Sequence, residues 1–77
     1  MRDIYDVTND LFIVFEQMRI LFRNWTKESP DVFMEGMLKF RALEKELEQV
    51  MGNEGNAHTI IQGIYRSVFP QGVQRAR

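Results

Sequence analysis

The chain has 77 residues, a formal net charge of −1 and no cysteine. This length predicts one domain, and the lack of cysteine excludes disulfides and thiolate metal sites from it. A single core of this size rarely supplies more than about 3–5 kcal/mol of stability. Oligomerisation is the remaining way to bury more surface, so we expect a homo-oligomer, with a dimer favoured. The near-neutral charge argues against a general nucleic-acid binder, which would carry a basic excess.

The beginning of the chain lacks the features of a secretory signal. Asp3 and Asp6 stand where a signal peptide carries basic residues. The most apolar run covers residues 11–15, well short of the roughly 20 apolar residues that span a bilayer. Together with the absence of cysteine, these features predict a cytoplasmic protein that does not bind membranes.

The first predicted helix covers about residues 3–25. Its apolar residues recur at alternating spacings of three and four, which keeps one helical face toward a partner helix. A surface helix usually has a polar back, but here further apolar residues lie off that face, so we expect another chain to bury part of this second set. The heptad positions are Ile4, Val7, Leu11, Val14, Met18, Leu21 and Trp25. The second set is Tyr5, Phe12, Ile13, Phe15, Ile20 and Phe22.

The second predicted helix covers about residues 30–51. Ser29 is a favourable N-cap and Pro30 suits the first helical position. Gly52 is placed to end the helix in the left-handed conformation. The connection to the first helix is short, which predicts an antiparallel helical hairpin.

Gly36 falls on the apolar face of the second helix. A glycine inside a helix costs about 1 kcal/mol relative to alanine. Its presence there indicates either chance or the close approach of a bulky side chain, for which we expect an aromatic of the first helix. The candidates are Phe12, Phe22 and Trp25.

The third predicted helix covers about residues 56–69, with Asn56 as its N-cap and Pro70 after its end. A basic tail, 70–77, follows. The chain is therefore predicted to be all-α, with a long antiparallel hairpin, a shorter third helix, and a bundle completed by a second copy.

A catalytic or cofactor-binding constellation is not apparent. His58 is the only histidine, and one histidine with scattered carboxylates makes a poor metal site. Glu44 and Glu48 share a helical face but lack the Glu-x-x-His motif of a diiron bundle. The glycine-rich stretch 52–56 has neither the GxxxxGK(S/T) nor the GxGxxG pattern of phosphate-binding loops. We therefore expect a non-enzymatic protein without metal or cofactor.

The content of methionine and aromatic residues favours protein–protein interaction. Five methionines and nine aromatics exceed the needs of one small core, and both residue types are enriched at interfaces. An adaptor, an inhibitor or a regulatory subunit would fit, and the small size would suit a phage- or bacterium-encoded regulator. The predicted interface residues are Phe12, Ile13, Phe15, Arg19, Phe22, Tyr65 and Phe69.

Two other functions remain open. The second and third helices resemble a helix-turn-helix arrangement, although the turn is expected to be longer than usual and the second helix is long. In that case the DNA contacts would be His58, Thr59, Gln62, Arg66, Arg75 and Arg77. Alternatively, an oligomer could hold a nucleotide between subunits, with Tyr65, Arg66 and His58 as its contacts.

Overall fold

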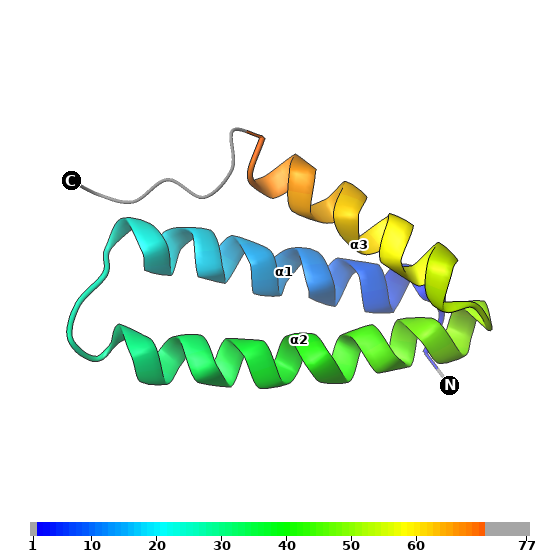
Figure 1. Cartoon of the computed structure of the whole chain (residues 1–77), viewed down its shortest axis with the longest axis horizontal. Coiled ribbons are helices and arrows are strands. Elements are labelled where there is room, and N and C mark those ends of the chain that lie inside the picture. The colour runs from blue at the N-terminus through cyan, green and yellow to red at the C-terminus, as the bar shows by residue number, and fades with distance from the viewer. Residues whose placement is uncertain (1, 71–77) are drawn as a thin grey trace.

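The computed structural model describes residues 2–70 and contains three helices, α1 (Ile4–Arg23), α2 (Ser29–Met51) and α3 (Glu54–Val68). α1 and α2 run antiparallel, and α3 returns along α1 on one side of this hairpin (Figure 1). Each helix contacts both of the others. The prediction of an all-α chain with a long hairpin and a shorter third helix is thus confirmed. Most of the predicted basic tail, with Arg75 and Arg77, lies outside the described residues.

α1 starts and ends with side-chain caps. The Asp3 carboxylate accepts a hydrogen bond from the Asp6 backbone N–H at 2.9 Å, as expected of an N-cap. The backbone leaves the helical conformation at Asn24, whose side-chain amide donates to the Ile20 carbonyl at 3.0 Å. Trp25 was predicted inside the helix but lies beyond its end.

The start of α2 differs from the prediction. Ser29 is the first helical residue and is only 2% exposed, and its hydroxyl accepts from the Thr26 N–H at 2.7 Å. Glu28 holds the N-cap position without a side-chain hydrogen bond. The prediction of Ser29 as N-cap is therefore wrong, because its hydroxyl instead closes the loop before the helix. At the other end Gly52 has a φ of 67°, which confirms the predicted left-handed stop.

α3 begins earlier than predicted. The Asn53 side chain caps the helix by accepting from the Asn56 N–H at 3.0 Å. Asn56 was predicted to be the cap and instead lies in the first turn. The connection between α2 and α3 is consequently only Gly52 and Asn53, so the expectation of a long turn is also wrong.

The core lies between the three helices. Four heptad positions of α1 are buried as predicted, and α2 and α3 cover them with further apolar side chains. The buried apolar residues are Val7, Leu11, Val14, Phe15, Met18, Leu47, Ala57, Ile61, Val68 and Phe69.

The predicted close approach at Gly36 is confirmed, with a different neighbour. A β-carbon built on Gly36 would lie 3.1 Å from the terminal methyl of Met18. This is tighter than ordinary van der Waals contact, so the glycine lets the buried methionine of α1 pack against α2. The expected aromatic neighbour is not there, because Phe22 and Trp25 pack nearer the loop between α1 and α2.

Candidate interaction surface on the α1–α2 hairpin

The predicted interface residues separate into buried and exposed groups. Phe15 and Phe69 are each 7% exposed and belong to the core of the single chain. The Phe15 ring lies 5.5 Å from that of Phe40 and 6.0 Å from that of Tyr65, measured between centroids. Phe15 and Phe69 therefore offer no surface to a second chain, and we remove them from the interface set. Phe15 is buried because Phe40 of α2 and Tyr65 of α3 pack against it.

Phe22 belongs to an aromatic cluster near the loop between α1 and α2. Its ring centroid lies 5.9 Å from that of Trp25, 5.7 Å from that of Phe33 and 6.4 Å from that of Phe69. Such tilted and offset pairs add about 0.5–1.5 kcal/mol beyond area burial. Phe22 thus joins α1 to α2 and to the residue that follows α3, and its ring is partly buried by these contacts within the single chain.

Arg19 and Tyr65 already have partners within the chain. The Arg19 guanidinium donates to the Glu16 carboxylate at 2.9 Å along α1. Tyr65 is 37% exposed, and its ring lies 5.0 Å from that of Phe69. Both side chains therefore make contacts within the single chain.

Phe12 and Ile13 are the predicted interface residues of α1 that the chain leaves exposed, at 40% and 45%. Ile20, seven residues after Ile13 and therefore on the same face of α1, is 53% exposed. The structure also exposes apolar residues of α2 that we did not predict, Val32, Met34 and Leu38, and of these Leu38 is the most exposed, at 68%. Its place off the heptad positions of the second helix was a signal in the sequence that we did not use.

A surface hollow of about 440 Å³ lies between α1 and α2. Ala42 lines it from α2, and Leu38 precedes Ala42 by one helical turn. Its lining includes no residue of α3. We call this hollow the α1–α2 groove, and we call Ile13, Ile20, Leu38 and Ala42 its apolar rim. The lining residues are Arg2, Asp10, Ile13, Val14, Gln17, Lys39, Ala42, Leu43 and Glu46.

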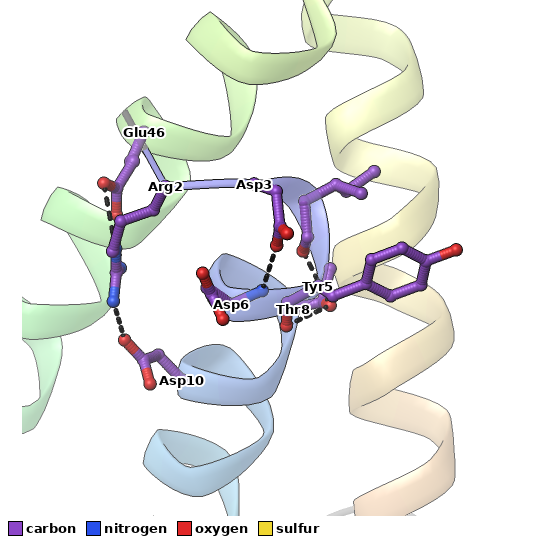
Figure 2. Close-up of polar contacts among 8 residues, drawn as sticks. Arg2, Asp3, Tyr5, Asp6, Thr8, Asp10 and Glu46 are labelled. Carbon is purple, nitrogen blue, oxygen red and sulfur yellow. Dashed lines mark hydrogen bonds and ion pairs between the residues drawn. The ribbon is translucent and has the colours of Figure 1, made fainter.

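One end of the α1–α2 groove is closed by a charged triad. The Arg2 guanidinium donates to Glu46 of α2, with Nε at 3.2 Å from Oε2, and forms an ion pair with Asp10 of α1. Figure 2 shows these three side chains on the α2 side of α1, whereas Tyr5 points toward α3. The hydrogen bond from Arg2 holds the pKa of the Glu46 carboxyl below its usual value. With one cation and two anions, the triad carries a net charge of −1.

The polar face of α3 carries the predicted DNA or ligand contacts. His58, Thr59, Gln62 and Arg66 are all exposed, and His58 and Gln62 are hydrogen-bonded to each other at 3.0 Å. A second hollow, of about 360 Å³, places His58 beside three carboxylates. A phosphate would meet these negative charges at the start of the helix, which opposes nucleotide or DNA binding there. The carboxylates belong to Glu44, Glu48 and Glu54.

The described residues include no group of three or more His, Cys, Asp or Glu side chains arranged to hold a metal ion. Nor does any helix within residues 2–70 have the length and apolar character needed to cross a membrane. Comparison with protein-family models, curated protein sequences and solved structures gives no significant match to this chain.

Proposed function

We propose that this protein is a non-enzymatic helical module that acts by binding protein chains, copies of itself included, through the α1–α2 groove and its apolar rim. The observation that carries the proposal is the exposure of Ile13, Ile20 and Leu38, at 45%, 53% and 68%. Isolated exposed apolar residues are common on soluble proteins. Of these three, however, Ile13 lines the hollow between α1 and α2, Ile20 follows it on the same face of α1, and Leu38 precedes the lining residue Ala42 by one turn. Apolar residues in and beside a hollow between two packed helices are expected of a docking surface for a helix.

The chemistry of the groove supports this proposal. Its apolar side chains lie at the centre, and charged residues stand at the ends, which is the usual anatomy of a protein interface. Binding there would suit an adaptor, an inhibitor or a regulatory subunit, working in the cytoplasm, and the small size suits a regulator encoded by a phage or a bacterium.

Site-specific photo-crosslinking in the source cell tests this function. A photoreactive amino acid would replace Ile20 or Leu38 in one pair of variants and Thr59 or Gln62 in a matched pair on the polar face of α3. We expect protein adducts at the first pair and few at the second. Nucleic-acid adducts at Thr59, with none to protein at Ile20 and Leu38, would overturn the proposal in favour of DNA binding.

DNA binding keeps one observation in its favour. The connection between α2 and α3 is only Gly52 and Asn53, which brings these helices nearer to a helix-turn-helix unit than the sequence suggested. A salt-dependent shift of labelled duplex DNA tests this alternative. If the glutamates beside His58 repel phosphate, no shift occurs even at low salt. A shift that Arg66→Ala abolishes would support DNA binding instead.

A further inference from the structure

The distribution of charge along the α1–α2 groove identifies its occupant. Lys39 lines the groove from α2, seven residues before Glu46 of the triad. At about 1.5 Å per residue, the two positions lie roughly 10 Å apart along the helix. Lys39 makes no ion pair with another residue of the described range 2–70. The ion pairs within that range are those of Arg2 with Asp10 and Glu46, and of Arg19 with Glu16. The groove thus has a negative end, an apolar middle with Ala42, and a positive end.

A surface with this sequence of charges is complementary to itself. A two-fold axis perpendicular to the groove, passing near Ala42, would place Lys39 of each copy opposite the negative triad of the other. Ile13 and Ala42 of both copies would meet between these charges, whereas Ile20 and Leu38 lie beyond the Lys39 end of the groove. Closed two-fold dimers require such a self-complementary patch. A foreign helix would need the same alternation of charge by coincidence.

We infer that the α1–α2 groove binds a second copy of this chain in an antiparallel two-fold arrangement. The two hairpins then form a four-helix bundle with each α3 on the outside. The Lys39 of each copy pairs with the triad of the other. This inference rests on the proposed function and names the partner for the same surface.

Two opposite charge reversals test this arrangement by sedimentation equilibrium of the full chain at low salt. Lys39→Glu places a negative charge against the negative triad, and Asp10→Lys changes the net charge of the triad to +1, opposite Lys39. Because the contact between Lys39 and the partner's triad occurs twice in each dimer, we expect either variant alone to raise the dimer Kd by about tenfold or more. An equimolar mixture of the two variants places unlike charges at both contacts, so it should form a heterodimer of nearly wild-type affinity.

Lys45→Glu is the matched control, since Lys45 is exposed on the same helix and does not line the groove. It should leave the dimer Kd unchanged, and circular dichroism should show equal helicity in every variant. If Asp10→Lys proves less helical, Glu46→Lys replaces it, because it makes the same change in the charge of the triad.

A wild-type chain that remains monomeric at about 1 mM, a concentration that detects even weak association, would overturn the inference. Equal weakening by Lys45→Glu, or a mixture that associates no better than its components, would overturn it as well. The proposed function is tested separately from this inference. Photo-crosslinks from Ile20 and Leu38 to a different protein, together with a monomeric wild type, would support protein binding and overturn only the inference of a second copy.

Discussion

The terminal methyl of Met18 and the α-carbon of Gly36 meet where α1 and α2 pack together: a β-carbon at Gly36 would lie 3.1 Å from that methyl. Gly63 of α3 is the matched glycine, because a β-carbon there would meet nothing within 4 Å. Each glycine lies inside a helix, so both give up helix propensity. They differ in whether another side chain lies close to the position that a β-carbon would take.

Substitution of these two glycines by alanine should have unequal effects. Gly63→Ala should raise the free energy of unfolding by about 1 kcal/mol through helix propensity alone. Gly36→Ala should raise it by less, because Met18 must move to admit the new methyl. Urea denaturation followed by circular dichroism measures both. Equal gains would mean that the approach of Met18 carries no energetic cost.

Phe12 and Phe15 give a matched pair on α1, exposed at 40% and 7%. Phe15→Ala should lower the free energy of unfolding by about 3–5 kcal/mol, since it removes a buried ring and leaves a cavity. That loss is comparable to the whole stability of a domain of this size, so helicity should fall markedly. Phe12→Ala should cost about 0.5 kcal/mol or less. Similar losses at the two positions in urea melts would contradict the burial of Phe15.

Asn53 and Asn56 test which residue caps α3. The Asn53 side chain accepts from the Asn56 N–H at 3.0 Å, so Asn53→Ala should destabilise the chain by about 1 kcal/mol. Asn56→Ala should be nearly neutral, because its backbone N–H still donates to Asn53. Thermal unfolding at neutral pH distinguishes the two variants. A larger effect at Asn56 would show that Asn56, as predicted from the sequence, is the N-cap of α3.

The pKa of Glu46 should depend on Arg2. The hydrogen bond from Arg2 lowers the pKa of this carboxyl from its ordinary value of 4.5. A lowered pKa in the folded state adds stability at pH values above 4.5, and this contribution is lost as the pH falls through the folded-state pKa. In Arg2→Gln the pKa should return toward 4.5, as followed by the carboxyl carbon shift of Glu46 in an NMR titration. An unchanged titration curve would show that the ion pair does not form in solution.

The spacing of apolar residues was enough to predict the hairpin and much of the core. Heptad positions such as Leu11 and Met18 are buried as the pattern requires, and Gly52 ends α2 because a left-handed residue is needed there. Helix ends were harder. Asn53 and Asn56 are equally suitable caps, and the choice between them depends on how short a turn the packing of α3 allows.

The exposed apolar surface was the least predictable feature. Phe12 and Phe15 lie less than one helical turn apart, and which of them is covered depends on where α3 crosses α1. That crossing is a tertiary relationship that the apolar pattern of one helix does not contain. Leu38 was not predicted because it lies off the heptad positions of α2, on the outer side of that helix.

The most direct test of the central claim is an amide NMR spectrum recorded between about 10 µM and about 1 mM, a range that covers weak to moderate affinities. We predict concentration-dependent shifts for residues that line the groove, such as Ile13, Gln17 and Ala42. The amides of Thr59 and Gln62 on α3 should stay constant. Spectra that do not change with concentration, or that change only on α3, would contradict the claim that this chain associates through its α1–α2 groove.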